Sequence, residues 1–571
     1  MRQWMVAAKK ADFYAIAEKF HVDPVVARII RNREVIGEKN IRIYLGGNLS
    51  DLSDPHQMKD MDQLVEILAQ KIRKQVHIRI IGDYDVDGVT SSHLFLTALR
   101  RVGAKVDVVI PHRIQDGYGL SLHLLQQAKE DGVDTILTCD NGIAAIDEIA
   151  WAKAQKMTVL VTDHHAVPFE EHEGRRTEKK SLADAVVNPH QQDCGYPYKE
   201  LCGAGVAWNV IRVLYENYDM DKREAEDLLD FVAMATVCDV MSLTGENRIL
   251  VKEGLKRIRH TKNIGLQALM QACNVQPENI SAYHFGYVLG PCVNATGRLD
   301  TARHALRLFE TGQETEAEEI ARDLVDLNQE RKELTLQGVE MAKKLCEEGG
   351  YENDPVLVLF LPDVHESIAG LIAGRIREMY NRPVFVLTRG EEGVKGSGRS
   401  TENYSMYENM CGCAELFTKF GGHPMAAGLS LPEENVEKFR RKINENCPLT
   451  VEEVCSDIHI DMAMPVGYAS TELVHQFALL EPFGKDNPSP LFADRNLSIS
   501  RMWLIGKNRN VLRMSVLSEY GQPVPVIFFG DVETLFAYFT EKFGQEEVEN
   551  ALHGRKNRIL FSMVYLSLIH I

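Results

Sequence analysis

Residues 80–92 read Ile80-Ile81-Gly82-Asp83-Tyr84-Asp85-Val86-Asp87-Gly88-Val89-Thr90-Ser91-Ser92. The apolar run that begins at Val76 predicts a buried strand, and 90–101 predicts a helix. In an extended segment, alternation would place Asp83, Asp85 and Asp87 on one side. Carboxylates this close repel one another unless cations neutralise them, and their oxygens suit Mg²⁺ or Mn²⁺. A helix cap would explain one aspartate and not three, so we interpret the stretch as a candidate metal site.

The chain has 571 residues, which predicts about three or four domains. Its 45% hydrophobic and 26% charged residues are typical of a globular protein. We find no apolar run long enough for a bilayer and no signal-peptide core near Met1. The 11 cysteines include no Cys-x-x-Cys pair, which disfavours a structural zinc site. We therefore expect a reduced, cytoplasmic protein.

The net charge of −18 argues against a protein that coats nucleic acid without specificity. A nuclease stays compatible with this charge, because metal-binding carboxylates add negative charge and a basic groove can be local. Composition alone leaves the binding partner open.

From Val76 onward, strand and helix patterns alternate. Strands are predicted at 76–82, 106–110, 135–139, 158–162 and 185–188, and helices at 90–101, 120–130, 143–156, 202–217 and 224–235. This alternation predicts an α/β fold with a parallel sheet and helices on both faces. In such folds the ligand crevice lies at the carboxyl ends of the strands.

Acidic or imidazole groups follow successive predicted strands. Asp83 and Asp85 follow the first, Asp140 follows the third, and Asp163-His164-His165 follow the fourth, while Asp239 closes a later apolar helix. Each has an ordinary alternative, as a helix cap, a loop residue or a solvated end. Their convergence on one edge of the sheet favours a common site.

Three motifs together resemble a known superfamily. Asp83-x-Asp85-x-Asp87-Gly88, Asp140-Asn141-Gly142 and Asp163-His164-His165 are similar to the DHH phosphoesterases, and more narrowly to the RecJ exonucleases. The similarity runs from about residue 76 to beyond 530. The DHH-family pyrophosphatases carry a histidine where this chain has Arg79, which disfavours that branch.

The resemblance implies two ions, Mn²⁺ or Mg²⁺, and specific roles for the residues above. The implied metal ligands are Asp83, Asp85, Asp140, His164 and Asp239, with Asp140 bridging. The implied catalytic residues are Asp163, which would orient the imidazoles, His165, which would face the substrate phosphate, and Arg298 in Gly290-Pro291-Cys292-Val293-Asn294-Ala295-Thr296-Gly297-Arg298. The alternative for Arg298 is a plain turn before a helix.

Further substrate-binding residues are implied by the same resemblance. Arg113 follows the second strand and would bind phosphate, although an exposed arginine is usually only solvated. Ser397 and Arg399, in Gly396-Ser397-Gly398-Arg399, would hold the terminal 5′-phosphate. His423, in a glycine-rich stretch, would join them. Glycine clusters can also be simple turns.

The predicted domains are a helical region at 1–75, the DHH domain at 76–300, a connecting helix at 301–348, a DHHA1 domain at 349–450 and an OB-fold barrel at 455–571. Trp503, Lys507, Arg509 and Arg513 either bind single strands or are ordinary barrel residues. The charged stretch 170–181 is interpreted as an exposed loop. The RecJ family continues with a further strand, so the sequence leaves barrel closure, and a truncated end, open.

The implied function is a 5′-to-3′ exonuclease specific for single-stranded DNA. It would release 5′-mononucleotides by two-metal hydrolysis, in DNA repair and recombination, with a helicase or single-strand-binding protein as a partner. A phosphodiesterase for cyclic dinucleotides or short RNA is an alternative, but those relatives are shorter and lack the barrel. A non-catalytic DNA-binding scaffold is a second alternative, but every implied ligand is present.

Overall fold

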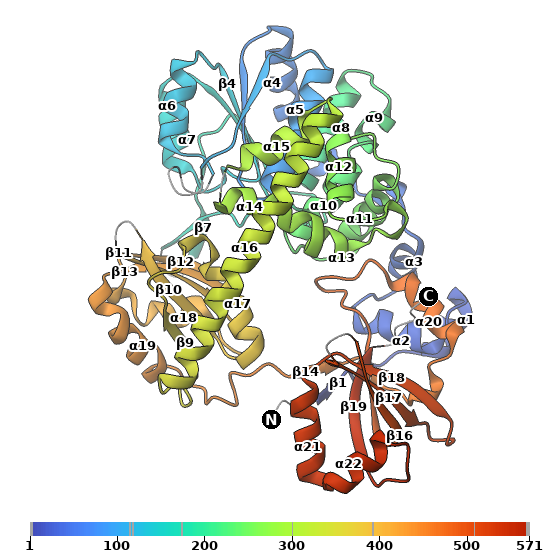
Figure 1. The fold of residues 1–571 in the computed structure, drawn as a ribbon. Coiled ribbons are helices and arrows are strands. Elements are labelled where there is room, and N and C mark those ends of the chain that lie inside the picture. Colours follow the sequence, from blue (N-terminus) through green and yellow to red (C-terminus); the bar gives the residue numbers. More distant parts are fainter. Residues whose placement is uncertain are drawn as a thin grey trace. The chain divides into compact units, whose positions relative to one another are not determined.

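The computed structural model describes residues 4–112, 116, 119–172, 175–299, 301–390, 393–506 and 509–566 (Figure 1). The predicted sites at Arg113 and Lys507 lie outside these residues. The chain forms two compact units. Unit 1 comprises 47–456 and 482–486, and unit 2 comprises 2–46, 457–481 and 487–571. Among the described residues, no helix has both the length and the apolar character needed to cross a membrane.

Unit 1 begins with a five-stranded parallel sheet, in the order β3-β2-β4-β5-β8. The strands are β2 (Ile78–Ile81), β3 (Val106–Val109), β4 (Thr135–Cys139), β5 (Thr158–Thr162) and β8 (Ala185–Val187). Each observed strand lies within its predicted range, so the predicted parallel sheet is confirmed.

Helices cover both faces of this sheet, because successive residues of a strand point to opposite faces (Figure 1). Leu137 joins the core formed with α4 (Met61–Arg73), α5 (Val86–Arg101) and α8 (Gly203–Asn217). Ile136 joins the other core, with α6 (Leu122–Glu130) and α7 (Ile146–Ala154). The prediction of one helix at 224–235 is wrong, because the chain forms two helices there, α9 (Lys222–Glu226) and α10 (Leu229–Cys238). The predicted loop at 170–181 includes a hairpin of β6 (Phe169–His172) and β7 (Arg175–Glu178).

The predicted extended geometry of the aspartate motif is wrong. Helix α5 starts at Val86, so Asp87 lies in its first turn. Asp85 is the residue before the helix, and its carboxylate accepts a hydrogen bond from the backbone N–H of Gly88 at 3.0 Å. A backbone that turns into a helix at this point does not keep alternate side chains on one side. The capping interpretation therefore holds for Asp85.

Two helices connect this sheet to the next part of unit 1. They are α15 (Ala302–Glu310) and α16 (Glu314–Glu348), with a short break near Gly312. The first half of α16 packs into the core of the first sheet through residues such as Leu324. Its second half packs through Val339 and Ala342 into a separate core. The predicted connecting helix is confirmed.

The second sheet has the order β12-β13-β11-β10-β9. Its strands are β9 (Leu357–Phe360), β10 (Val384–Gly390), β11 (Gly393–Arg399), β12 (Lys419–His423) and β13 (Ala426–Leu431). Helix α17 (Glu366–Tyr380) packs with α16 on one side of the sheet, and α18 (Met406–Cys411) and α19 (Val436–Glu445) pack on the other. The two glycine-rich stretches thus form strands and not turns.

Unit 2 joins the two ends of the sequence. Strand β1 (Trp4–Val6) pairs in parallel with β14 (Ile458–Ile460). Helices α1 (Phe13–Phe20), α2 (Pro24–Asn32) and α3 (Glu38–Gly46) belong to this unit, whereas α4 belongs to unit 1. The structure therefore divides the region 1–75 that the sequence suggested as one domain.

The rest of unit 2 is a sheet with short helices. Its strands are β15 (Met462–Ala463), β16 (Leu491–Ile505), β17 (Val511–Leu517), β18 (Pro523–Phe528) and β19 (Leu560–Leu566). Long β16 pairs with β15, β17 and β19, and β17 pairs with β18. The helices are α20 (Thr471–Gln476), α21 (Val532–Phe543) and α22 (Gln545–Leu552), which were not predicted from the sequence.

Candidate active site

Three aspartates meet at the carboxyl edge of the parallel sheet. Ligand oxygens of Asp83, Asp85 and Asp140 lie within 4.8 Å of one another. Asp83 follows β2, and Asp140 follows β4 with a left-handed backbone, φ 61°. A Cβ at Gly203 would lie only 2.6 Å from the Cβ of Asp140, so glycine at the start of α8 allows this close approach.

His164 links this group to Asp239. Its Nε2 lies 3.1 Å from Oδ1 of Asp140 and 3.6 Å from Oδ2 of Asp239. Asp239 caps the end of α10, so a residue far along the sequence reaches the same edge. All five predicted metal ligands thus lie in one cluster.

Asp87 has a different environment from the other aspartates. Its carboxylate oxygens accept hydrogen bonds from the backbone N–H groups of Gly203 at 2.6 Å and Ala204 at 2.7 Å. These donors are the first residues of α8, where unpaired N–H groups favour an anion. Asp87 therefore ties α5 to α8, although its Oδ2 is also 3.7 Å from His164.

Asp163 holds the Asp-His-His segment in place. One of its oxygens accepts from the backbone N–H of His165 at 3.1 Å and lies 2.8 Å from Nδ1 of that imidazole. The other accepts from the N–H of Ile143 at 2.9 Å. Burial alone would lower the pKa of His165, but the hydrogen bond to Asp163 and the nearby carboxylates raise it to about 9. The hydrogen bond with Asp163 thus favours the protonated form of the His165 imidazole.

The donor set fits hard divalent cations. Oδ1 of Asp83 is buried and has no hydrogen-bond partner among the described residues. Burial, together with the charge of Asp85, raises the pKa of Asp83 well above its usual value. Burial and Asp87 do the same for the pKa values of Asp140 and Asp239. Carboxylate oxygens with an imidazole nitrogen are the ligands that Mn²⁺ and Mg²⁺ sites use, and a cation would offset this repulsion.

The motif before α15 packs directly on the aspartate loop. Its residues form α14 (Gly290–Leu299), which includes no turn. A Cβ at Gly297 would lie 2.4 Å from the carbonyl oxygen of Tyr84, and Asn294 accepts from the N–H of Val86 at 3.2 Å. Arg298 donates from Nη1 to the carbonyl of Ser367 at 2.6 Å, at the start of α17. Arg298 therefore links α14 to the start of α17.

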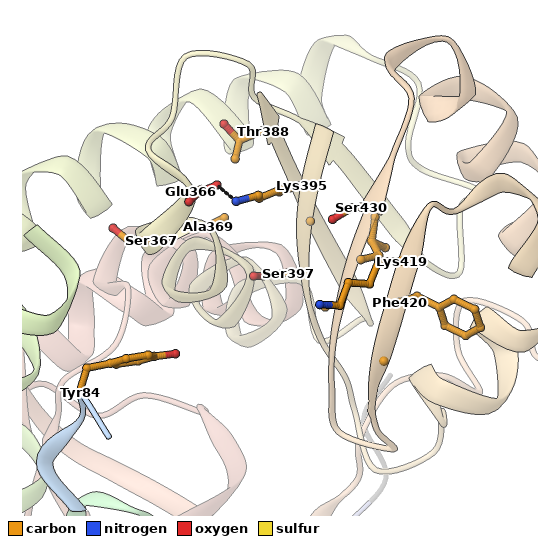
Figure 2. Close-up of a pocket in the computed structure, with 14 residues that line it drawn as sticks. Tyr84, Glu366, Ser367, Ala369, Thr388, Lys395, Ser397, Lys419, Phe420 and Ser430 are labelled. Carbon is orange, nitrogen blue, oxygen red and sulfur yellow. Dashed lines mark ion pairs between the residues drawn. The ribbon is translucent and has the colours of Figure 1, made fainter. Parts of the chain in front are cut away.

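The other predicted substrate residues lie on one face of the second sheet. Arg399 on β11 and His423 on β12 both pair with Ala426 on β13, which lies between them. Ser397 lies two residues before Arg399 on β11, so its side chain is on the same face of the sheet. Arg399 also donates to the carbonyl of Gly398 at 2.8 Å. Ser397 lines a pocket of about 450 Å³. Figure 2 shows Tyr84, from the aspartate motif, lining the same pocket.

A basic and aromatic cluster lies on the sheet of unit 2. Trp503 on β16 pairs across the sheet with Arg513 on β17. The guanidinium carbons of Arg501 and Arg513 lie 5.1 and 6.0 Å from the ring centre of Trp503. Arg509 lies in the turn between these strands, with a φ of 52°. The structure thus groups Trp503 and Arg513, and it adds Arg501.

Family models match three parts of the chain. They describe the DHH family N-terminal domain at residues 77–236, the DHHA1 domain at 353–447 and the RecJ OB domain at 460–558. The chain is 34% identical over 518 residues to the single-stranded-DNA-specific exonuclease RecJ of Haemophilus influenzae, covering 87% of this chain and 88% of that protein. The chain belongs to the RecJ family.

Two further RecJ relatives extend the comparison. The Bacillus subtilis RecJ is 32% identical over 512 residues, which cover 89% of this chain but 63% of that longer protein. The crystal structure of RecJ from Thermus thermophilus with Mn²⁺ has a TM-score of 0.76 at 27% identity, over 91% of this chain and 74% of that one. The RecJ resemblance and the order of DHH, DHHA1 and OB domains are confirmed.

Several residues that line this pocket were not found from the sequence. Tyr84 was read only as a spacer between aspartates, and Lys395, Lys419 and Ser430 were not singled out. The period-two pattern of the strands would have placed Lys395 on the same face as Ser397. Glycine-rich composition obscured these strands, because glycine is depleted in strands.

Proposed function

We propose that this chain is an exonuclease specific for single-stranded DNA that works from the 5′ end, releases 5′-mononucleotides and serves DNA repair and recombination. The observation that carries this proposal is that one unit holds both the acidic–imidazole cluster and the pocket lined by Ser397. The names of the H. influenzae and B. subtilis relatives support the same activity.

Two Mn²⁺ or Mg²⁺ ions are the proposed cofactor. The proposed ligands are Asp83, Asp85, Asp140, His164 and Asp239. Asp140 groups with Asp83 and Asp85 and also with the two histidines, so it would be the carboxylate shared by both ions. When bound, such ions polarise the phosphodiester and lower the pKa of a water nucleophile. RecJ of T. thermophilus has been crystallised with either metal.

The cationic residues around the cluster are suited to a phosphate substrate. His165, held by Asp163, lies beside the carboxylates and would contact a phosphate oxygen. Arg298 is anchored to the carbonyl of Ser367 and would stabilise negative charge on the substrate. Both act by charge and position, and both are proposed as catalytic.

Recognition of the strand end is assigned to the second sheet. Ser397, Arg399 and His423 would hold the terminal 5′-phosphate, because charged donors form strong hydrogen bonds with phosphate oxygens. Holding the end at a fixed place selects which phosphodiester reaches the metal cluster, and this selection makes the enzyme an exonuclease. Arg113 is proposed as a further phosphate ligand from its sequence position alone.

The barrel and the cellular setting complete the proposal. Trp503 and Arg513 offer an aromatic face and a cation, the pairing that single-strand-binding barrels use. The 11 free cysteines agree with a reducing cytoplasm. A helicase or single-strand-binding protein as partner is proposed from the family resemblance only.

The proposal is tested with Mn²⁺ and four substrates, namely 5′-labelled single strands, 3′-labelled single strands, duplex DNA and cyclic dinucleotides. We expect mononucleotide release from the 5′ end of single strands with either label, no activity in EDTA and little activity on duplex DNA or cyclic dinucleotides. Preferential hydrolysis of cyclic dinucleotides would overturn the exonuclease assignment. A catalytically silent protein that still binds single strands would favour a scaffold.

Asp140→Ala is the matching variant. We expect its rate to fall by several orders of magnitude while binding of single strands largely survives, because the change removes the carboxylate shared between the groups. Asp147→Ala, an exposed aspartate at the start of α7, is the control and should retain full activity. Substantial activity in Asp140→Ala would contradict the two-metal assignment.

A further inference from the structure

Two free cysteines on neighbouring helices of unit 1 lie against each other. Cys273 caps the end of α12 (Ile264–Ala272), and Cys292 lies in the first turn of α14. Their Sγ atoms are 3.8 Å apart. Both helices pack on α16, which fixes where the two side chains meet. Because a disulfide bond is about 2 Å long, a small movement would bring these sulfurs to bonding distance.

An amide from α16 contacts the sulfur of Cys292. Nδ2 of Asn328 donates a hydrogen bond to this sulfur at 3.3 Å. Oδ1 of the same amide accepts hydrogen bonds from the guanidinium of Arg331 at 2.8 and 3.1 Å. Asn328 is 4% exposed, so the contacts are shielded from water. A donor that is polarised by a cation stabilises negative charge on the atom it contacts.

The surroundings of Cys292 favour its thiolate. The S–H of Cys273 donates to the sulfur of Cys292 and lowers the pKa of Cys292, although burial opposes this effect. Asn328 and the positive charges of Lys332 and Arg331 lower it further. The same hydrogen bond, together with burial, raises the pKa of Cys273. Cys292 is therefore the nucleophile of the pair, because the thiolate is the reactive form of cysteine.

Other cysteines of unit 1 are less reactive by the same criterion. Burial raises the pKa values of Cys346 and Cys413 to about 11. They stay in the thiol form near neutral pH, and oxidation follows thiolate character and exposure. Cys273 is partly exposed, so a small oxidant has access to the pair from the solvent. Oxidation by a peroxide should therefore begin at this pair.

We propose that Cys273 and Cys292 react with hydrogen peroxide to form a reversible disulfide, and that this bond slows the nuclease. The thiolate of Cys292 attacks one peroxide oxygen, and the O–O bond breaks to give a sulfenic acid and hydroxide. Cys273 then attacks the sulfenic sulfur, and the S–O bond breaks to release a second hydroxide. The two thiol protons convert both hydroxides to water, and two electrons pass from the sulfurs to the peroxide.

The disulfide would act on the nuclease through α14, which packs on the aspartate motif. Asn294, two residues after Cys292, accepts from the N–H of Val86, and Gly297 packs tightly against the carbonyl oxygen of Tyr84. Closing the sulfur gap from 3.8 Å to about 2 Å would disturb these contacts. A displacement of about 1 Å in a catalytic site can cost about a hundredfold in rate. This part of the proposal rests on the proposed exonuclease function.

The chemistry is tested on the full chain without metal. The reduced protein is treated with hydrogen peroxide, separated from it by gel filtration, alkylated with N-ethylmaleimide and digested without a reductant. We expect mass spectrometry to find the peptides of Cys273 and Cys292 joined, and dithiothreitol to separate them. In Cys273→Ser the sulfenic acid of Cys292 should persist and react with dimedone. Full alkylation of both cysteines after peroxide treatment would overturn the proposal, whether or not the protein is a nuclease.

The effect on activity is measured with Mn²⁺ and a 5′-phosphorylated single strand after the peroxide has been removed. We expect oxidation to lower kcat/KM at least about tenfold, and dithiothreitol to restore it. Cys292→Ser keeps a hydroxyl for Asn328, so it should match the reduced parent and not respond to peroxide. Cys411→Ser, at an exposed cysteine outside the pair, should respond as the parent does.

The outcomes separate this proposal from the proposed function. A disulfide that forms without loss of activity would overturn the regulatory role, as would an equal loss of activity in Cys292→Ser. A reduced protein that releases no nucleotides would contradict the exonuclease assignment, while peptide mapping would still decide whether the disulfide forms.

Discussion

At the scale of single residues, environment separates side chains that the sequence makes look alike. Asp85, Asp87 and Asp140 are all acidic and all near the cluster. Both carboxylate oxygens of Asp87 accept hydrogen bonds from the N–H groups of Gly203 and Ala204. In contrast, the buried Oδ1 of Asp83 has no hydrogen-bond partner among the described residues. The carboxyl ends of parallel strands lie at one edge of the sheet, so the order of the strands was enough to predict which residues would meet. It could not predict Asp87's partners, because they come from a helix more than a hundred residues later.

The proposed binding of the terminal 5′-phosphate by Arg399 can be tested by mutation. If it binds a terminal phosphate, its loss removes a charge-assisted hydrogen bond worth about 1.5–3 kcal/mol. We expect Arg399→Ala to slow cleavage of 5′-phosphorylated strands roughly ten- to a hundred-fold and to erase their advantage over 5′-hydroxyl strands. Measuring kcat/KM for both strands with both proteins checks this.

Arg389 offers a matched control on the same sheet. It is exposed on β10 and pairs with Glu433 at 2.9 Å, away from the pocket. Arg389→Ala should leave the preference for 5′-phosphate unchanged. A full preference in Arg399→Ala would move the end-binding role elsewhere, and Arg113 would be the next residue to test.

The buried His93 should make the free energy of unfolding decrease at acid pH. Its ring is buried on α5, 4.5 Å from Phe231 and 5.8 Å from Phe309, and its Nδ1 has no described hydrogen-bond partner. Burial lowers the pKa of His93 to about 3, from 6.5 in the unfolded chain. Between these values the unfolded chain binds a proton that the native chain does not. Stability is therefore lost as the pH falls below 6.5, by about 2 kcal/mol at pH 5.

His93→Phe should remove this loss. The larger ring has room, because His93 lines a cavity of about 740 Å³. We expect the free energy of unfolding to become less dependent on pH between 7 and 5 than in the parent, as measured by denaturant titration. His260→Phe, at an exposed histidine of the same cavity, should change stability by less than about 0.5 kcal/mol. An unchanged acid dependence in His93→Phe would contradict the assignment.

At the scale of elements, strands with apolar runs were predicted well and strands with glycines were not. β4 and β5 consist of apolar residues and threonines that are almost all buried, the pattern of parallel strands covered on both faces. β11 and β12 consist largely of glycine, polar and charged residues, and their pairing with β13 supplies the structure that local sequence does not. The same glycines hollow the pocket.

Gly428 tests whether that hollow is functional. A Cβ there meets no atom within 4 Å, and valine suits a strand, so Gly428→Val should keep or raise the melting temperature. Its side chain would occupy the pocket floor beside Ser397, so we expect KM for single strands to rise at least about tenfold. Thermal melting and steady-state kinetics on the same preparation check both expectations.

Gly396, on the neighbouring strand β11, should give the opposite pair of outcomes. A Cβ there would lie 2.4 Å from Cδ2 of Leu387, so Gly396→Val should destabilise the sheet. The two variants thus separate filling of the pocket from damage to the core. Normal kinetics in a folded Gly428→Val protein would show that the pocket stays empty during the reaction.

At the scale of the whole molecule, unit 2 depends on contacts between the two ends of the chain. β1 pairs with β14, and Tyr44 donates to Asn487 at 2.7 Å. The sequence could indicate helices at 13–20 and 24–32 from their apolar periodicity, but not their partners more than four hundred residues away. Domains predicted from the sequence alone are therefore continuous segments of the chain, whereas unit 2 is built from segments that are distant in the sequence.

Arg33 holds these two ends together. It forms a two-pronged ion pair with Asp461, with distances of 2.6 and 2.9 Å, and both side chains are less than a tenth exposed. Breaking a buried pair by removing one partner costs about 3–5 kcal/mol. Arg33→Ala should therefore unfold unit 2 at lower temperature or denaturant, as followed by limited proteolysis with mass spectrometry.

The activity of Arg33→Ala should show which steps depend on each unit. Unit 1 carries the metal cluster and the pocket, so Arg33→Ala should still hydrolyse a 5′-phosphorylated dinucleotide at close to the parent rate. Unit 2 carries Trp503 and Arg513, so KM for a long single strand should rise. Arg31→Ala removes a partly exposed pair with Glu34 and should cost less than about 1 kcal/mol. If Arg33→Ala loses dinucleotide hydrolysis as well, the metal-binding unit needs an intact unit 2 in order to work.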